Sequence, residues 1–312
     1  MMNTTVILPA AGLGSRFAVC DRASASKIEF ELAHKPVFLH AIEAFCDRPD
    51  VGQVLLAVHP KRLDDFRFRF GDKLDFFGVT LIAGGEAARW ETVKLALDRV
   101  AEDATHIAIH DAARPCPSRA MIDRVFAAAE RYGAALPGLP MSDTVKRAEP
   151  AEPEPSSADL LDALFDDPED ASGSAALIRE TIPRAGLYRV QTPQVFDRRM
   201  IVEAYAALNN DNAEGITDDA SVAERAGHPV FIVEGDPMNL KLTLPGDAEL
   251  LEAVTRLRHE QNARAAATRE LFGDDDPVLL FLRKQPRRYA SQAKHDTLIA
   301  SFLRRVASRR CF

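Results

Sequence analysis

Short apolar runs alternate with longer segments of helical spacing, and this alternation constrains the fold more than any other feature of the sequence. Runs rich in β-branched residues and bounded by turn residues are typical of buried strands. The runs are TVILPA, QVLLAV, VTLIAGG, HIAIHDAA, GAALPGLP and PVFIVEG. Strand followed by helix, repeated, predicts an α/β fold with a doubly wound, mostly parallel sheet and helices on both faces.

Three of the intervening segments carry apolar residues at helical spacing. They are residues 36–47, 89–101 and 118–133. In the third, Ser118 is suited to cap the first turn and Gly133 to end the last one, because serine accepts backbone N–H groups and glycine adopts positive φ. We therefore expect a helix between these two residues.

Length, charge and cysteine content limit the class of protein. The 312 residues have a formal net charge of -8, so the whole molecule is not a general binder of polyanions. Any phosphate must then be held by a local cluster of cations. The four cysteines form no C-x-x-C pair and fit no zinc motif, which favours a reduced, cytoplasmic setting. The first residues lack the features of a signal peptide, and no run predicts a bilayer span.

Two segments interrupt the α/β pattern. Residues 149–178 are acidic and rich in Pro, Ser and Ala, with one possible short helix at 160–165. We expect a solvated, partly disordered insertion there. After about Arg258 the chain becomes basic and partly amphipathic. Such a tail could bind RNA, a membrane surface or an acidic partner, but we favour docking on the acidic body or simple solvation.

The segment AAGLGSRF leaves the first predicted strand and must turn sharply. Gly12 and Gly14 permit positive φ and let backbone N–H groups approach an anion, while Arg16 adds a positive charge. The loop is not the dinucleotide fingerprint, because Phe17 stands where that motif needs glycine, and it lacks the G-K-[ST] of a Walker A loop. A purely structural tight turn is the alternative reading.

Charged residues also follow another predicted strand, where His110 and Asp111 precede Arg114. Ligands bind at the carboxyl ends of strands in open parallel sheets. A carboxylate at such an end, beside an arginine, suits a divalent metal on phosphates. The alternative is an aspartate that caps the next helix. Lys241 lies in a short extended segment further along the chain.

Six motifs, taken in order, carry a resemblance to a known family. They are LPAAGLGSR, HDAARPC, SDTVKR, QTPQVF, ITDDAS and NLKLTLPGD. Together they resemble the 2-C-methyl-D-erythritol 4-phosphate cytidylyltransferases, over residues 4 to about 256 apart from the acidic insertion. The ribitol 5-phosphate cytidylyltransferases share the architecture, but they tend to carry A-G-G and H-D-S-V-R-P where this chain has AAG and HDAARP.

The resemblance implies a Rossmann-like nucleotidyltransferase fold with an extended dimerisation arm, and we also expect a C-terminal helical extension. The resemblance also implies a catalytic domain over 1–257, with the arm and insertion at about 141–186. It does not explain the basic extension over 258–312, which we expect as a separate segment. The implied reaction transfers the cytidylyl group of CTP to 2-C-methyl-D-erythritol 4-phosphate and releases pyrophosphate, in non-mevalonate isoprenoid precursor synthesis. Mg²⁺ is the implied metal, held at Asp111, and the implied assembly is a homodimer.

Site residues follow from the same resemblance, position by position. The catalytic cations would be Arg16, Lys27, Arg184 and Lys241. CTP would be bound by Pro9, Ala10, Ala11, Gly12, Gly14, Gly84, Gly85 and Thr92. The acceptor and its phosphate would be held by Asp111, Arg114, Thr144, Thr192 and Thr217.

The chain departs from the family pattern in four places: beside Lys27, in the GGEAARWETV loop, in the acidic insertion and in the C-terminal extension. Ser26 and Ile28 flank Lys27 where the family usually reads P-K-Q, and Thr92 stands where a serine is common. Two other functions stay open. The alternative functions are a ribitol-5-phosphate or other polyol-phosphate cytidylyltransferase, and a catalytically idle nucleotide-binding regulatory protein. We expect no membrane or nucleic-acid partner, although the basic tail leaves the latter open.

Overall fold

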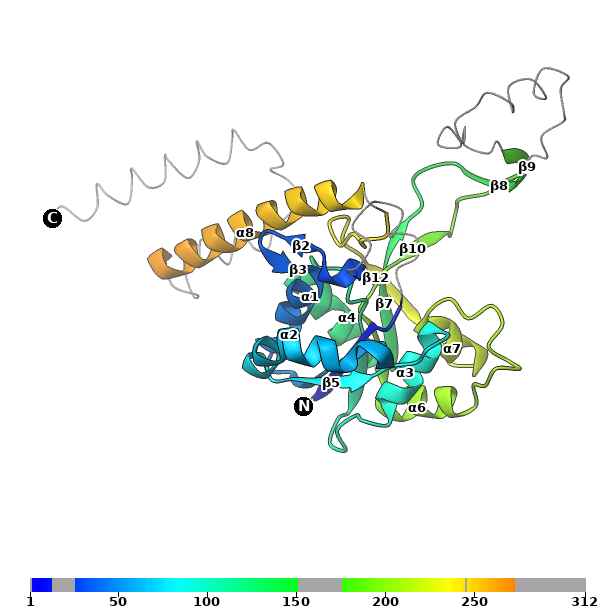
Figure 1. Cartoon of the computed structure of the whole chain (residues 1–312). Coiled ribbons are helices and arrows are strands. Elements are labelled where there is room, and N and C mark those ends of the chain that lie inside the picture. The colour runs from blue at the N-terminus through cyan, green and yellow to red at the C-terminus, as the bar shows by residue number, and fades with distance from the viewer. Residues whose placement is uncertain (1, 13–25, 151–175, 245, 273–312) are drawn as a thin grey trace, which may run out of the picture. The chain divides into compact units, whose positions relative to one another are not determined.

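A computed structural model describes residues 2–12, 26–150, 176–244 and 246–272. The chain divides into two compact units, Met1–Thr255 and Arg256–Phe312. The first unit contains the central sheet and the helices that cover it (Figure 1). The predicted short helix at 160–165, the loop residues Gly14 and Arg16, and the basic tail after Phe272 lie outside the described residues.

The central sheet has eight strands in the order β10-β7-β11-β6-β1-β4-β5, with β12 paired to β7. Its strands are β1 (Thr4–Ala10), β4 (Val51–Val58), β5 (Val79–Ala83), β6 (His106–Ile109), β7 (Ala134–Pro140), β10 (Tyr188–Val190), β11 (Gln194–Asp197) and β12 (Phe231–Glu234). Strand β1 is central and runs parallel to both β4 and β6. The six predicted strands are all present, and the doubly wound α/β class is confirmed.

Strand β11 gives the sheet its mixed character, and the sequence did not predict it. It runs antiparallel to both β6 and β7 and so joins the two parallel parts of the sheet. Strand β10 is also antiparallel to β7, while β12 is parallel to it. Because β11 is antiparallel to β6, the loop that precedes β11 lies at the edge of the sheet where β6 ends.

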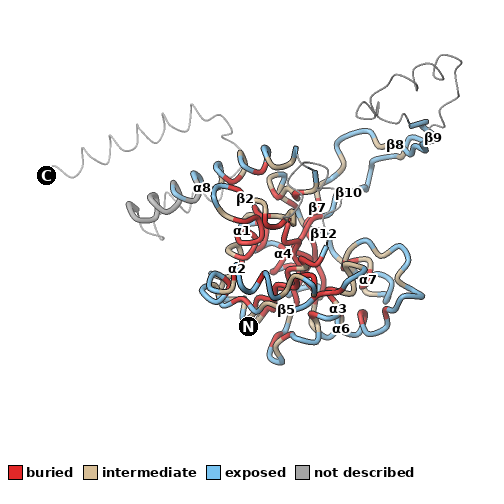
Figure 2. The backbone as a smooth tube through the Cα atoms, viewed as in Figure 1, coloured by how far each residue is buried: buried red, intermediate tan, exposed pale blue. Residues whose placement is uncertain are grey.

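Helices cover both faces of the sheet. The helices are α1 (Val37–Cys46), α2 (Leu63–Phe76), α3 (Arg89–Leu97), α4 (Arg119–Tyr132), α6 (Arg198–Ala206) and α7 (Asp219–Arg225). Alternate side chains of β1 belong to different cores: Val6 and Leu8 join residues of α1, α2 and α4, whereas Ile7 joins residues of α3, α6 and α7. The buried residues of these two cores are among those coloured red in Figure 2.

The helix boundaries test the sequence predictions. In α4 the Ser118 hydroxyl accepts from the Met121 N–H at 3.4 Å, and Gly133 ends the helix with φ of 85°, so both cap predictions are confirmed. The helix predicted over 89–101 is wrong at its end, because α3 stops at Leu97. The Val100 N–H turns back to the Leu97 carbonyl, and Val100 packs in the core from outside the helix.

The arm is an antiparallel hairpin of β8 (Val145–Pro150) and β9 (Ala176–Ile182), with a register shift between Arg147 and Ala148. Its residues are mostly exposed. Residues 151–175 of the acidic insertion connect the two strands in the sequence. The arm prediction therefore corresponds to a two-stranded element on either side of the insertion.

Helix α8 (Asp247–Phe272) begins in the first unit and continues into the second. Two further strands, β2 (Glu31–Leu32) and β3 (Lys35–Pro36), form a small separate hairpin. The three-residue 3₁₀ turns are η1 (Lys27–Glu29) and η2 (Pro60–Arg62). Within the described ranges, none of the helices has the length and apolar content needed to span a bilayer.

Candidate active site

Four parallel strands end at the same edge of the sheet, and the polar loops of the candidate site follow three of them. Strands β6, β1, β4 and β5 are neighbours in that order. The chain continues from β1 into Ala11–Gly12, from β5 into Gly84–Gly85, and from β6 into His110–Asp111. Since ligands bind at the carboxyl edge of such sheets, this edge is the candidate active site.

Asp111 is the centre of a cluster of three cations. Its Oδ2 lies 2.8 Å from Lys241 Nζ and 3.5 Å from Arg114 Nε. Its Oδ1 lies 3.5 Å from Arg89 Nε. The Asp111 side chain is 11% exposed and that of Lys241 is 34% exposed, so the lysine lies between the buried carboxylate and solvent. The cluster carries three positive charges against one negative charge from Asp111.

The charge state of Asp111 follows from its surroundings. Burial would raise the pKa of its carboxyl group, but the positive charges of Arg89, Lys241 and Arg114 outweigh burial and hold the pKa well below its usual range. Asp111 is therefore ionised at neutral pH. An ionised carboxylate that keeps three cations together suits a site for anions: with the buried Asp219, which pairs with Arg89 at 2.7 Å, three positive charges face two negative ones and one positive charge remains.

Arg89 is the member of the cluster that the sequence predictions missed. It occupies the first turn of α3, and its Nη2 donates to Asp219 Oδ2 at 2.7 Å. Asp219 is fully buried and also accepts from the Tyr205 hydroxyl at 2.7 Å. Burial opposes the charge on Arg89, but Asp219 and Asp111 raise its pKa above the ordinary value. Its place four residues after a strand-end glycine pair was the available signal.

His110 and Thr192 hold the backbone around Asp111. Burial lowers the pKa of His110 to about 4, so its ring is neutral. Its Nε2 lies 3.0 Å from the Arg114 carbonyl oxygen, which can only accept, so Nε2 carries the proton. Nδ1 then accepts from the Thr192 hydroxyl at 3.0 Å, and that oxygen accepts from the Asp111 N–H at 3.0 Å. This relay fixes the carboxyl end of β6 against the loop that precedes β11.

Asn239 completes the framework from the segment that carries Lys241. It is fully buried, and its Nδ2 donates to the Thr192 carbonyl at 2.9 Å. Its own carbonyl accepts from Arg114 Nη1 at 2.7 Å. Gln191 donates from Nε2 to the Asp236 carbonyl at 2.9 Å in the same region. The predicted residues Arg114, Thr192 and Lys241 are thus brought together with Asp111 through residues that the sequence predictions did not name.

The glycine pair after β5 lies tightly against α3 and β1. A Cβ on Gly84 would lie 2.7 Å from Thr92 Cγ2 and 3.0 Å from Ala11 Cβ, so a larger residue does not fit. The Gly85 N–H donates to Thr92 Oγ1 at 3.0 Å, and Thr92 is buried. In this structure Thr92 supports the glycine pair, and Gly84 lies between Thr92 and Ala11 of the loop after β1.

The sequence profile of the 2-C-methyl-D-erythritol 4-phosphate cytidylyltransferase family matches residues 4–153 and 163–257. The chain belongs to this family. The cytidylyltransferase of that name from Acidobacterium capsulatum is 37% identical over 264 residues, which cover 82% of this chain and 99% of that protein. The one from Rhodopirellula baltica is 37% identical over 263 residues, covering 81% of this chain and 94% of that protein.

Solved structures of the family share the fold. The crystal structure of a 4-diphosphocytidyl-2C-methyl-D-erythritol synthase has a TM-score of 0.61 at 27% identity and covers 82% of this chain and 99% of that one. The cytidylyltransferase from Thermus thermophilus has a TM-score of 0.59 at 27% identity and covers 80% of this chain and 98% of that one. Both matches span nearly the whole of the other chain.

Some residues predicted from the cytidylyltransferase family lie outside the Asp111 cluster. Arg184 and Thr144 are exposed at the base of the arm, where Arg184 Nη1 donates to the Ser142 carbonyl. Thr217 is exposed before α7, and its N–H donates to Ser221 Oγ at 3.3 Å. Lys27 begins η1. Within one chain, therefore, Arg184 contacts the arm rather than Asp111.

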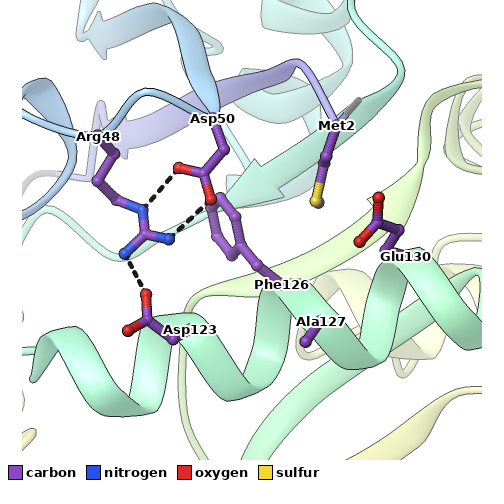
Figure 3. Close-up of a pocket in the computed structure, with 7 residues that line it drawn as sticks. All are labelled: Met2, Arg48, Asp50, Asp123, Phe126, Ala127 and Glu130. Carbon is purple, nitrogen blue, oxygen red and sulfur yellow. Dashed lines mark hydrogen bonds and ion pairs between the residues drawn. The ribbon is translucent and has the colours of Figure 1, made fainter.

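A pocket at the opposite edge of the sheet has a different character (Figure 3). Met2 and Asp50 line it, and they precede β1 and β4, so it lies at the amino ends of these strands. Its arginine, Arg48, is paired with Asp50 at 2.8 Å and Asp123 at 2.7 Å, and it stacks 4.8 Å from the centre of the Phe126 ring. Three carboxylates, Asp50, Asp123 and Glu130, line the pocket against this one arginine, so its net charge is negative and does not match a site for triphosphate.

Proposed function

We propose that this protein transfers the cytidylyl group of CTP to 2-C-methyl-D-erythritol 4-phosphate, giving 4-diphosphocytidyl-2-C-methyl-D-erythritol and pyrophosphate. It acts in the non-mevalonate synthesis of isoprenoid precursors, and CTP as the co-substrate fits a cytoplasmic location. The single observation that carries the proposal is the cluster of Arg89, Arg114 and Lys241 around Asp111 at the carboxyl edge of the sheet, in a chain of this family.

The reaction requires two polyanions to meet. A phosphate oxygen of the acceptor attacks the α-phosphorus of CTP in line, the bond to the bridging oxygen breaks, and pyrophosphate leaves with the electron pair. No covalent intermediate with the protein is needed. Positioning and stabilisation of the growing negative charge therefore supply the catalysis. We assign the charge at the α-phosphate and leaving group to Arg16 and Lys27.

We assign CTP to the two loops that follow β1 and β5. Their residues are Pro9, Ala10, Ala11, Gly12, Gly14, Gly84, Gly85 and Thr92. Backbone N–H groups of such glycine loops approach an anion closely because no side chain intervenes. The tight contact of Gly84 with Ala11 and Thr92 supports a common pocket for base, ribose and triphosphate.

A divalent metal, Mg²⁺ in our proposal, would join the site with the nucleotide. Among the described residues no group of three or more His, Cys, Asp or Glu could hold a metal ion alone. This fits Mg²⁺, which usually binds through one or two carboxylates together with substrate phosphates and water. Asp111 would be the protein carboxylate, and the ion would stabilise charge on the phosphate oxygens. Lys241, which lies 2.8 Å from Asp111, would then turn toward a phosphate.

We assign the acceptor phosphate to Lys241 and Arg184, with Arg114, Thr144, Thr192 and Thr217 as companions. Arg184 and Thr144 belong to the base of the arm, and in its own chain Arg184 contacts Ser142 rather than the Asp111 cluster. A homodimer in which the arm of one subunit completes the site of the other would bring the two halves of this set together.

Pyrophosphate release tests the proposal. We would incubate the full chain with CTP and Mg²⁺ against methylerythritol, ribitol and erythritol phosphates, with ATP, GTP and UTP as nucleotide controls. We expect release with CTP and methylerythritol phosphate, and its loss when EDTA removes the metal. Lys27→Ala should lower kcat by about 10²–10³-fold, the usual effect of removing one group that stabilises transition-state charge. Faster release with ribitol phosphate would favour the polyol alternative, and none with any acceptor would favour an idle binding protein.

A further inference from the structure

Glu29 is a buried carboxylate two residues after Lys27, and the proposed chemistry does not use it directly. Both residues belong to η1. The Glu29 side chain is 1% exposed and has two arginine partners: Arg62 Nη1 lies 2.7 Å from Oε1, and Arg69 Nη1 lies 2.6 Å from Oε2. Each carboxylate oxygen therefore contacts its own guanidinium group.

The two arginines connect η1 to the strand-end edge of the sheet. Arg62 ends η2, the turn that follows β4, and Arg69 lies in α2, the helix that comes next. Asp65 also contacts both arginines, 3.8 Å from Arg62 Nη2 and 3.3 Å from Arg69 Nη1. We refer to Glu29, Arg62 and Arg69 as the Glu29 clamp. Through this clamp, the turn that contains Lys27 is attached to the carboxyl end of β4.

The backbone of the turn transmits this attachment to Lys27. The Phe30 N–H donates to the Lys27 carbonyl at 3.4 Å, and the Glu29 N–H donates to the Ser26 carbonyl at 2.8 Å. Ile28 lies between them with 4% exposure in the same core as α1 and α2. Apolar packing therefore fixes Ile28, and the Glu29 clamp fixes Glu29.

Stability alone does not explain a carboxylate at this position. Burying an ionised group costs free energy that its partners must offset, and well-packed apolar residues often replace a buried ion pair without loss. Ile28 and Phe30 show that the neighbouring positions accept apolar side chains. A charged clamp does, however, restrain the carboxylate more narrowly than apolar contact, because Arg69 donates a 2.6 Å hydrogen bond to Oε2 while Arg62 forms an ion pair with Oε1. A catalytic lysine needs this restraint, since a misplacement of about 1 Å can cost about 100-fold in rate.

We propose that Glu29 is a positioning residue for Lys27. Held by Arg62 and Arg69, it fixes η1 at the end of β4 so that the lysine faces the triphosphate bound along the same edge. The family usually has a polar glutamine directly after this lysine, where this chain has Ile28. Glu29, one residue later, would take over the role of that polar neighbour. This inference rests on the proposed function, because it gives Glu29 a role only if Lys27 acts on CTP.

A double-mutant cycle tests the proposal with purified full-length protein and labelled CTP. Glu29→Gln, Lys27→Ala and the double variant are compared under saturating substrates. We expect Glu29→Gln to lower kcat by about 10–100-fold while both KM values change little. In the Lys27→Ala background the same substitution should cause no further loss, because the group that it positions is absent. A purely structural role would instead lower activity equally in both backgrounds.

The control removes a carboxylate that is paired with a buried arginine at the other edge of the sheet; the Asp50 side chain is 28% exposed. Asp50→Asn takes one carboxylate from Arg48, whose side chain is 8% exposed, and leaves Asp123 as its partner (Figure 3). We expect this variant to lower the melting temperature and leave kcat unchanged. The contrast separates a loss of stability from a loss of lysine placement.

The outcomes distinguish this inference from the proposed function. Wild-type kcat in folded Glu29→Gln, or the same loss with and without Lys27, would overturn the positioning role alone. Near-normal turnover of Lys27→Ala would overturn the role of Lys27 itself. If Glu29→Gln does not fold, Arg62→Ala and Arg69→Ala replace it, since these arginines are 28% and 41% exposed and each leaves Glu29 one partner. Unchanged kcat in both would equally reject the clamp.

Discussion

Lys241 Nζ lies 2.8 Å from Asp111 Oδ2, and this contact joins the segment before α8 to the end of β6. The lysine is one of three cations on a single buried carboxylate. In the proposed reaction, the lysine would exchange Asp111 for the greater negative charge of an entering phosphate. Asp111 therefore holds the Lys241 ammonium group near the candidate site until a ligand is present.

Lys241→Ala should lower kcat/KM for the acceptor by about 100-fold, because one charge that stabilises the incoming phosphate is removed. The decrease in kcat/KM for CTP should be smaller, because Lys241 is assigned to the acceptor phosphate. Steady-state kinetics with each substrate varied in turn measures both. Lys35→Ala is the control, since Lys35 forms a similarly half-buried pair with Glu43 at 2.6 Å, away from Asp111 in sequence and outside the proposed site. Equal losses for the two substrates would contradict the acceptor assignment.

His110 should make the protein less stable as the pH falls from 6.5 toward 4. Burial lowers the pKa of the folded His110 to about 4 from its ordinary value of 6.5. Between these values the unfolded chain binds the proton and the folded chain does not, so acid favours unfolding by up to about 1.4 kcal/mol per pH unit. Below pH 4 both states bind it and the contribution becomes constant.

Urea unfolding across this pH range measures the effect. Between pH 6.5 and 4, the free energy of unfolding of His110→Gln should depend less steeply on pH than that of the wild type. The difference in slope should correspond to at most one bound proton. His34→Asn removes an exposed imidazole and serves as the comparison. If His110→Gln keeps the wild-type slope, the buried ring is not neutral in the folded protein and the relay through Thr192 is wrongly assigned.

Gly84→Ala should raise the KM for CTP. The added methyl group would lie 2.7 Å from Thr92 Cγ2 and 3.0 Å from Ala11 Cβ, so the two nucleotide loops must separate. We expect at least a tenfold increase, about 1.4 kcal/mol, with a smaller change in kcat. Gly71→Ala is the matched control, because its methyl group in α2 meets only Arg67 Cγ at 3.9 Å. That variant should bind CTP normally and be more stable by about 0.5–1 kcal/mol.

The sequence predicted the parallel part of the sheet because periodicity and strand-end glycines are local features. It missed α2, in which Phe66, Phe68 and Phe70 alternate with arginines as in a strand. Tertiary packing decides this segment: Phe66 and Phe70 point into the core and Phe68 is 91% exposed. Arg89 could not be placed by spacing either. It follows β5 and meets Asp111 after β6, and β1 and β4 lie between these strands.

Arg184 should act on the site of the partner subunit. In its own chain it contacts Ser142 at the base of the exposed arm, whereas Lys241 contacts Asp111 in the body. Arg184→Ala and Lys241→Ala should each give a nearly inactive homodimer. In a mixed dimer, one site would combine the intact body of the first chain with the intact arm of the second.

Co-expression with two different affinity tags isolates this mixed dimer. We expect it to recover about half of the wild-type kcat per dimer, because one of its two sites is fully restored. Arg184→Ala/Lys241→Ala paired with itself provides the background rate, and sedimentation velocity verifies that each sample is dimeric. If Arg184 instead served its own subunit, both sites of the mixed dimer would carry a substitution and no activity would return.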